Sequence, residues 1–352
     1  MSYADGWAAL NLEMPPRVPR TEYSAPQHWD LVRAVTGLEV YSDSPAEVQT
    51  QASAAFMRAW NFDFVWNTNI GGDIFGDVHT SMGHAVYATD GVDFNTNRHS
   101  AFSSPEQVLA FDPEERLPHH DHAAIVQRFD DNWRATCELY PDCVNMCGIY
   151  TTLMSGLIDL FGWDLLLLAA GTDPVAFGQV AHRYSRWIQR FFDALAESAS
   201  PVVMIHDDMV WTQGAFLRPS WYREYLFPNL RRQLAPLAEA GKIILFTSDG
   251  NYTEFLDDVA DCGVSGFVME PSVDMAHLAE KYGRTHSFVG NADCRILLSG
   301  TRAQIRAEVE RCMAIGKRCP GYFLAVGNHL PPNTPVANAL YYNEVYEELS
   351  RR

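Results

Sequence analysis

The sequence predicts an α/β fold, a (β/α)8 (TIM) barrel with an N-terminal helical extension, and two observations predict it. The first is a pattern that occurs four times in the last third of the chain: a short apolar run, then polar residues, then a helix-like stretch. The apolar runs are 243–246, 266–269, 287–289 and 322–325. Buried parallel strands have this appearance because helices cover both faces of their sheet. In a barrel, the residues that follow such strands converge on one end.

The second observation is that the same alternation extends toward the N-terminus. Further apolar runs lie at 63–67, 144–150 and 201–205. Helix-like stretches lie between or after the runs, at 173–198, 219–240, 251–261, 274–282, 301–316 and 335–350. Strands that alternate with helices in this way are typical of stacked βαβ units. Seven strands are identified by these runs, and we expect an eighth between residues 80 and 100.

Residues 1–60 contain two helix-like stretches that begin near Ala25-Pro26 and Ser44-Pro45. Proline suits the first turn of a helix, because the N–H group it lacks has no partner there. We expect residues 1–60 to form a helical extension packed on the barrel as a lid or collar, and residues 61–352 to form the catalytic barrel domain. The long loop-rich stretch after the first barrel strand is expected to form part of the pocket wall.

Composition excludes several classes of function. The chain has 352 residues with 44 acidic and 26 basic side chains, a formal charge of −18, so it offers no basic surface to nucleic acid. Its seven cysteines are odd in number and scattered, which favours reduced thiols and a cytoplasmic protein. No signal peptide is visible, and the most apolar segment, 163–171, is too short to span a membrane.

Polar side chains follow all four apolar runs of the last third. The candidates for one pocket are therefore Asp249, Glu270, Asp293 and His329. Asp249, Glu270 and His329 offer the oxygen and imidazole ligands that metal ions bind. Each has a structural alternative. Asp249 stands before a helix and can cap it, Glu270 can form a salt bridge to a neighbouring strand, and His329 can be a hydrogen-bonded histidine without catalytic duty.

A further cluster, His206-Asp207-Asp208, follows the apolar run 201–205. These groups can orient a ligand, bind substrate or shift a proton affinity, and we expect one of the three only to cap the turn. His84, in the long loop, is a further candidate for the pocket. No G-x-G-x-x-G follows a strand, and neither a phosphate loop nor G-x-S-x-G is present. Nucleotide-dependent chemistry and serine hydrolysis are therefore disfavoured.

Two strings near the C-terminus, 290–301 and 327–335, resemble the end of the uroporphyrinogen decarboxylase superfamily. The resemblance extends back through Asp207-Asp208, 218–224 and 104–106, so it covers most of the chain. It implies a TIM barrel. The superfamily includes the decarboxylase itself and corrinoid-linked methyltransferases.

The resemblance favours one branch over the others. The decarboxylase has a basic cleft and an arginine-rich segment near its N-terminus, which residues 15–20 do not match. Methyltransferases that load coenzyme M hold zinc with a His-x-Cys pair and a later Cys, and these positions fall here on Thr247, Asp249 and Asn328. The oxygen and imidazole set that remains resembles the ether-cleaving branch, in which the zinc ligands include carboxylates.

We therefore expect a corrinoid-dependent, O-demethylase-like methyltransferase that moves a methyl group from a small methoxylated or otherwise methylated substrate to cob(I)alamin on a partner corrinoid protein. Zinc is expected on Asp249, Glu270 and His329, with His206, Asp208 or His84 orienting the substrate or supplying a proton. Substrate contacts are expected from Trp66, Asn67, Phe94, Trp211, Asn291 and Asn328. The alternatives are a uroporphyrinogen decarboxylase-like enzyme and a non-catalytic small-molecule-binding barrel. A homodimer is compatible with the sequence.

Overall fold

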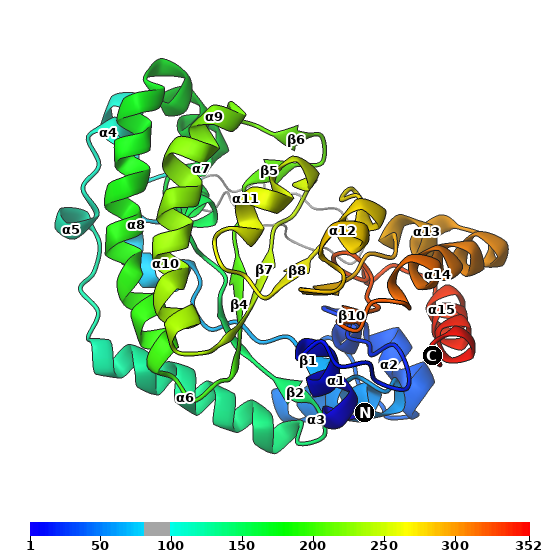
Figure 1. The fold of residues 1–352 in the computed structure, drawn as a ribbon. Coiled ribbons are helices and arrows are strands. Elements are labelled where there is room, and N and C mark those ends of the chain that lie inside the picture. Colours follow the sequence, from blue (N-terminus) through cyan, green and yellow to red (C-terminus); the bar gives the residue numbers. More distant parts are fainter. Residues whose placement is uncertain (81–98) are drawn as a thin grey trace.

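The computed structural model describes residues 1–80 and 99–352, in which a ring of short strands is surrounded by helices (Figure 1). The strands of the ring are β1 (Phe64–Val65), β2 (Val144–Asn145), β3 (Cys147–Ile149), β4 (Val202–His206), β7 (Ile243–Thr247), β8 (Gly266–Val268), β9 (Ser287–Val289) and β10 (Tyr322–Phe323). A separate hairpin consists of β5 (Val210–Trp211) and β6 (Gly214–Ala215).

Helices precede the ring and alternate with its strands. They are α1 (Tyr3–Leu10), α2 (Trp29–Thr36), α3 (Ala46–Ala59), α4 (Pro105–Leu109), α5 (Pro113–Arg116), α6 (His122–Leu139), α7 (Met154–Thr172), α8 (Pro174–Glu197), α9 (Pro219–Trp221), α10 (Phe227–Glu239), α11 (Leu256–Ala260), α12 (Met275–Tyr282), α13 (Cys294–Ser299), α14 (Arg302–Gly316) and α15 (Val336–Leu349). Short segments of other helix types are η1 (Ala25–Gln27), η2 (Gly72–Val78), η3 (Tyr222–Leu226) and η4 (Thr253–Phe255). The alternation predicted from the sequence is confirmed.

All pairings within the ring are parallel. Six strands are hydrogen-bonded in the order β10-β9-β8-β7-β4-β3, and β1 pairs with β2, which immediately precedes β3 in the chain. The side chains of β4 are all buried, as expected where helices cover a parallel sheet on its outer face. The carboxyl ends of these strands therefore lie at one end of the ring.

The segment Pro19–Thr21 closes the ring between β10 and β1. The Leu324 N–H donates to the Pro19 carbonyl over 2.9 Å, and the Thr21 N–H donates to the Leu324 carbonyl over 3.2 Å. On its other side, the Asp63 N–H donates to the Arg20 carbonyl over 3.0 Å. The eighth position of the barrel thus belongs to the N-terminal region. The strand expected between residues 80 and 100 falls almost wholly on residues 81–98, outside the described part of the chain. The closing segment could not be recognised in the sequence, because Pro19-Arg20-Thr21 does not form an apolar run.

Helix α7 is longer than the apolar segment that the sequence suggested. The segment Leu153–Thr172 is long and apolar enough to cross a membrane, yet 72% of its most apolar window is buried inside the fold. A helix that is hydrophobic all round is normally buried in a core. The described structure is that of a soluble domain with an apolar core helix.

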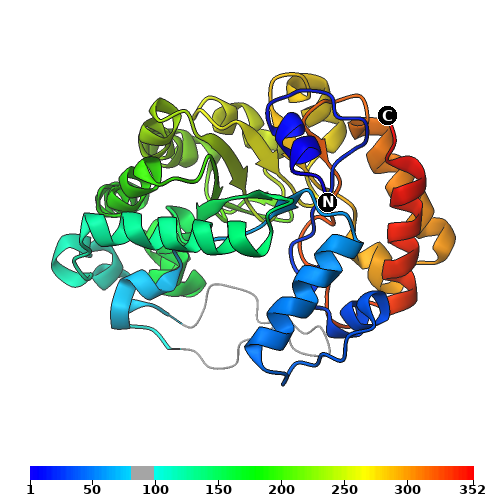
Figure 2. The same ribbon diagram turned by 90° about the horizontal axis from the view of Figure 1, so that it is seen from below.

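Both ends of the chain lie on the same side of the molecule (Figure 2). The Val18 N–H donates to the Ser350 carbonyl over 2.8 Å, and Arg17 forms an isolated antiparallel bridge with Arg351. The N-terminal segment is therefore held between the barrel strands and the chain that follows α15.

Candidate functional site

A pocket of about 70 Å³, here called the inner pocket, opens at the carboxyl ends of the barrel strands. Six of the residues that the sequence predicts for the site line it: Trp66, His206, Asp249, Glu270, Asn328 and His329. They follow five different segments of the ring, which is why sequence order alone does not show how close they are. The fold thus brings these six residues to one cavity at the strand ends.

His206, Asp208 and Asp249 form a group able to hold a metal ion, because their ligand atoms all lie within 4.8 Å of one another. His206 ends β4, and its Nε2 lies 3.1 Å from Asp208 Oδ1. Asp249 follows β7, and its N–H donates to the same Asp208 oxygen over 3.0 Å. Among residues 1–80 and 99–352 this is the group whose possible ligand atoms lie close enough together to share one metal ion, and it is called the metal-ligand group below.

The orientation of His206 suits metal binding. Its Nδ1 lies 2.8 Å from the Tyr150 carbonyl oxygen. Because a carbonyl can only accept, Nδ1 carries the hydrogen and Nε2 faces the carboxylates. Histidine ligands to metals usually have their second nitrogen bonded to such an acceptor. The imidazole also stacks on the Tyr150 ring, with centroids 4.0 Å apart and an interplanar angle of 2°.

Without a metal, the same carboxylates favour a proton on His206. Burial of the ring lowers its pKa, but the charge of Asp208 and the hydrogen bond to it, with Asp249 adding to them, raise the pKa to about 9. A proton and a metal ion therefore compete for Nε2.

Ser155, at the start of α7, holds the turn that carries His206 and Asp208. Its Oγ accepts from the Asp208 N–H over 2.8 Å, and its own N–H donates to Asp207 Oδ1 over 2.9 Å. Asp207 is fully buried, and burial raises its pKa to about 6. Asp207 is thus the member of the triplet that caps, since its carboxylate is directed at the N-terminus of α7.

Glu270 lies in the inner pocket, but its carboxylate ties together two neighbouring loops. Its Oε2 accepts from the Gly250 N–H over 2.8 Å, and its Oε1 accepts from the side-chain amide of Asn328. Glu270 does not belong to the metal-ligand group of the described residues. Its expected role as a metal ligand is therefore corrected: strand order brought it to the pocket, and local hydrogen bonds direct its oxygens at backbone and amide groups.

His329 also lines the inner pocket without joining the metal-ligand group. Its ring packs edge-on against Tyr23, with centroids 4.7 Å apart. Burial lowers the pKa of His329 to about 4, so the imidazole is neutral at pH 7. The expectation that His329 binds the metal is corrected, because the metal-ligand group of the described residues consists of His206, Asp208 and Asp249.

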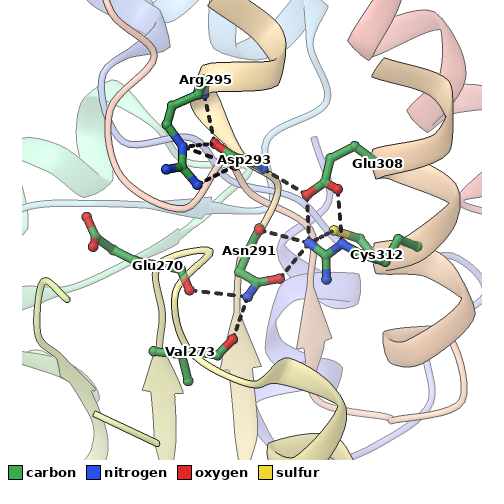
Figure 3. A network of polar contacts seen from close by, with 8 residues as sticks. Glu270, Val273, Asn291, Asp293, Arg295, Glu308 and Cys312 are labelled. Atoms are coloured by element: carbon green, nitrogen blue, oxygen red, sulfur yellow. Dashed lines mark hydrogen bonds and ion pairs between the residues drawn. The ribbon is translucent and has the colours of Figure 1, made fainter. Parts of the chain in front are cut away.

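Asn291 is buried and positions the loop after β8 (Figure 3). Its Nδ2 donates to the carbonyls of Glu270 and Val273, each over 3.2 Å, and its Oδ1 accepts from Arg311 over 3.0 Å. Arg311 in turn pairs with Glu308 of α14 over 2.6 Å. In Figure 3 the Glu270 carboxylate points away from Asn291. Asn291 therefore holds the loop after β8 in place and does not line the inner pocket. Its expected contact with the substrate is corrected.

The remaining candidates lie elsewhere. Asp293 caps α13 and pairs with Arg295 over 2.7 Å, and it does not line the inner pocket. Trp211, in the β5–β6 hairpin, is 46% exposed and packs against Phe216 rather than lining the inner pocket. Asn67 lines a second, neighbouring cavity. His84 and Phe94 fall outside the described residues, so the expectations for them stay predictions.

Sequence reasoning missed two tyrosines of the inner pocket. Tyr150 follows β3, and Tyr23 follows the closing segment Pro19–Thr21. Burial, with the nearby acidic groups adding to it, raises the pKa of both hydroxyls, so each keeps its proton at neutral pH. Tyr150 could have been predicted, because residues that follow a barrel strand face the pocket. Tyr23 could not, because the segment before it, Pro19–Thr21, has no apolar run that marks it as part of the barrel.

Comparison with known proteins assigns the family. The family model for uroporphyrinogen decarboxylase (URO-D) matches residues 144–349, more than half of the chain. The chain belongs to the uroporphyrinogen decarboxylase family. Among curated members of this family, the uroporphyrinogen decarboxylase of Coxiella burnetii is 24% identical over 182 residues, covering 50% of this chain and 48% of that protein. A uroporphyrinogen decarboxylase of Thermus thermophilus is 27% identical over 161 residues, covering 46% and 45%.

The matched region thus spans about half the length of these curated relatives. A solved methyltransferase from Methanosarcina mazei matches 97% of this chain and 96% of its own, with a TM-score of 0.64 and 17% identity. At this identity the likeness shows the fold. The predicted TIM-type barrel of the uroporphyrinogen decarboxylase superfamily is confirmed.

Proposed function

We propose that the chain is a methyltransferase that moves a methyl group from a small methoxylated, or otherwise methylated, substrate to the cob(I)alamin of a corrinoid protein, with the help of a metal ion. The observation that carries the proposal is the group formed by His206, Asp208 and Asp249 at the inner pocket. Family membership and a methyltransferase of like fold support the wider class of methyltransferase or decarboxylase.

The donor set fits zinc. One imidazole nitrogen and two carboxylate oxygens match a catalytic zinc site, which has three protein ligands and one open position. Zinc held there would act as a Lewis acid on the ether or alcohol oxygen of the substrate. The hydrogen bond from His206 Nδ1 to the Tyr150 carbonyl fixes the tautomer that such a ligand needs.

Two tyrosines of the chain would stabilise the oxygen that leaves when the methyl group is transferred. Tyr150 and Tyr23 line the inner pocket and remain protonated, so either hydroxyl can donate a hydrogen bond to the substrate oxygen. As the methyl carbon passes to cob(I)alamin, the C–O bond electrons stay with that oxygen, which leaves as phenolate or alkoxide. Hydrogen bonds that strengthen as this charge develops accelerate the reaction.

Porphyrin decarboxylation is the second candidate, and the names of the curated relatives favour it. A substrate with several carboxylates needs cationic partners, because burying an unpaired charge is costly. Among the described residues that line the inner pocket there is no lysine or arginine, whereas Asp249 and Glu270 are acidic. This charge pattern supports the methyltransferase over the decarboxylase.

The first test is metal content. Purified protein is expected to hold one zinc per chain, and Asp249→Asn is expected to weaken zinc affinity at least tenfold, measured by competition with a chelator. The exposed Asp261, at the end of α11, offers a matched control, so Asp261→Asn should bind zinc as the wild type does. Equal zinc affinity in Asp249→Asn and the wild type would refute the assigned ligand set.

The second test is methyl transfer. Zinc-loaded protein is mixed with cob(I)alamin and a panel of methoxyarenes, methanol and methylamines, and methylcobalamin is followed by absorbance. Formation of methylcobalamin with the wild type and its loss in Asp249→Asn are expected. Release of carbon dioxide from uroporphyrinogen, without methyl transfer, would instead establish the decarboxylase. A protein that binds zinc and does neither would be a small-molecule-binding barrel.

The seven free cysteines support a reducing, cytoplasmic setting for this reaction.

A further inference from the structure

A second cavity, here called the outer cavity, lies beside the inner pocket and is much larger. Its volume is about 680 Å³, against about 70 Å³ for the inner pocket. Helix α3, the turn η1 and the end of β1 contribute to its wall, and the last turn of α6 closes another side. Ligand pockets of drug-sized molecules fall in the range of roughly 300–1,000 Å³. The outer cavity has the size for a whole small molecule, and the inner pocket has room only for a small group.

The two spaces share a wall made of two aromatic side chains. Tyr23 and Trp66 line both the inner pocket and the outer cavity. Their ring centroids are 6.3 Å apart, and Tyr23 also packs edge-on against His329. A ligand in the outer cavity therefore lies one aromatic layer away from the inner pocket.

The described wall of the outer cavity carries one charged side chain, and that charge is balanced. Glu22 is the charged residue among the described residues that line it. Its carboxylate is already neutralised, because Oε1 pairs with Arg20 over 2.9 Å and accepts from the Tyr342 hydroxyl over 2.9 Å. Its Oε2 accepts from the Val326 N–H over 2.9 Å. No cation of the described wall is left to bind an anionic ligand.

The rest of the wall combines rings with uncharged polar groups. Trp29, Phe62 and Tyr140 supply aromatic surface, while Gln27 and Asn67 supply amides. Rings of this kind pack against planar ligands, and amides bind hydroxyl and ether oxygens. The wall therefore suits an uncharged aromatic molecule that carries oxygen substituents.

We propose that the outer cavity binds the part of the substrate that stays behind after demethylation, an uncharged methoxylated aromatic ring. Its methoxy group is directed at the side of the cavity lined by Tyr23 and Trp66, which also line the inner pocket that holds His206 and Asp249. This inference rests on the proposed function and specifies its substrate class as neutral methoxyarenes.

The test fills the outer cavity from two of the helices that line it. Thr50 of α3 and Thr136 of α6 line it, and each hydroxyl donates to carbonyls of its own helix turn. Thr50→Trp and Thr136→Trp therefore fill the cavity without removing a tertiary hydrogen bond. Thr172 of α7 has the same local bond, to the Leu168 carbonyl, and is exposed, so Thr172→Trp is the matched control.

Binding of 2-methoxyphenol is measured by titration calorimetry, without any corrinoid, after circular dichroism has verified that each variant is folded. Wild type and Thr172→Trp are expected to bind alike, and Thr50→Trp and Thr136→Trp at least tenfold more weakly. The matched anion 2-methoxybenzoate is expected to bind the wild type at least tenfold more weakly than 2-methoxyphenol, because the described wall offers its carboxylate no cation.

The outcomes separate this inference from the proposed function. No binding of 2-methoxyphenol by the wild type, or equal binding by the wild type and both cavity variants, overturns the inference whether or not methyl transfer occurs. Binding that both tryptophans weaken supports it. If that binding is found but zinc-loaded protein transfers no methyl group from 2-methoxyphenol to cob(I)alamin, the proposed function fails and the outer cavity stands as a site for neutral aromatics.

Discussion

At the residue scale, the two pocket histidines differ because their neighbours differ. His206 has carboxylates within reach of Nε2, and they raise its pKa to about 9 against the effect of burial. His329 has the Tyr23 ring beside it, and burial lowers its pKa to about 4. Sequence placed both after barrel strands and assigned the metal to His329. The proposal that His206 binds the metal instead rests on the carboxylates of Asp208 and Asp249 near its Nε2.

The lowered pKa of His329 predicts a pH-dependent stability. Between pH 6.5 and about 4 the unfolded chain takes up a proton that the folded chain does not, so the contribution of His329 is present above pH 6.5 and is lost as pH falls to about 4. The loss amounts to roughly 3 kcal/mol at most, because the pKa of His329 lies about 2.5 below its value in the unfolded chain. Urea unfolding of the wild type and His329→Gln at pH 7.0 and pH 4.5 measures it.

In that experiment, the wild type is expected to lose more stability than His329→Gln on acidification. His286 is the natural control, since burial lowers its pKa away from the pocket, and His286→Gln should leave the contribution of His329 intact. An identical pH dependence in the wild type and His329→Gln would contradict the assignment.

At the element scale, the site is built by loops that strands hold side by side. Glu270, at the end of β8, accepts from Gly250 after β7 and from Asn328 after β10. Gly250 has a φ of +83°, and an added Cβ would lie 2.6 Å from the Trp211 carbonyl, so only glycine fits there without strain. Glu270 therefore fixes the loop that carries Asp249.

We expect Glu270→Gln to lower the free energy of unfolding by about 1–3 kcal/mol, because the new amide turns a donor toward a group that also donates. Zinc affinity should fall as well, since the Asp249 loop loses its support. Urea unfolding with an unchanged slope, together with chelator competition, measures both effects. The exposed Glu254, in η4, supplies the control Glu254→Gln. Unchanged stability and zinc affinity in Glu270→Gln would show that the carboxylate does not hold the loop.

At the scale of the whole molecule, a buried cation joins the N-terminal region to the barrel. Arg20 is fully buried in the closing segment and pairs with Glu22 over 2.9 Å. Its guanidinium also lies 4.6 Å from the centre of the Trp60 ring and 4.5 Å from that of Tyr346. The sequence predicted an extension over residues 1–60 and a barrel over residues 61–352. The segment Pro19–Thr21 belongs to the first range and yet completes the ring of strands.

We expect Arg20→Met to lower the free energy of unfolding by about 3–5 kcal/mol, because Glu22 would remain buried without its cation. The double variant Arg20→Met/Glu22→Gln should recover part of the loss, since it removes the stranded charge. Thermal and urea unfolding of the three proteins measure this. An equal loss in the single and double variants would indicate that ring contacts, rather than the ion pair, account for the role of Arg20. The control is Arg302, which is exposed and paired with Glu344. Arg302→Met should lower the free energy of unfolding by less than about 1 kcal/mol.

The sequence by itself determined the barrel, because buried parallel strands must be apolar along their length and helices must separate them. It also determined that Asp249, Glu270, His329 and His206 reach one pocket, since strand ends converge. Only the tertiary structure decided which of these groups face one another. It selected Asp208 and His206 as partners of Asp249, and it recruited Arg20 and Tyr23 from a segment without an apolar run. Side-chain direction and ring closure depend on contacts between residues far apart in the chain, and a local pattern carries no record of them.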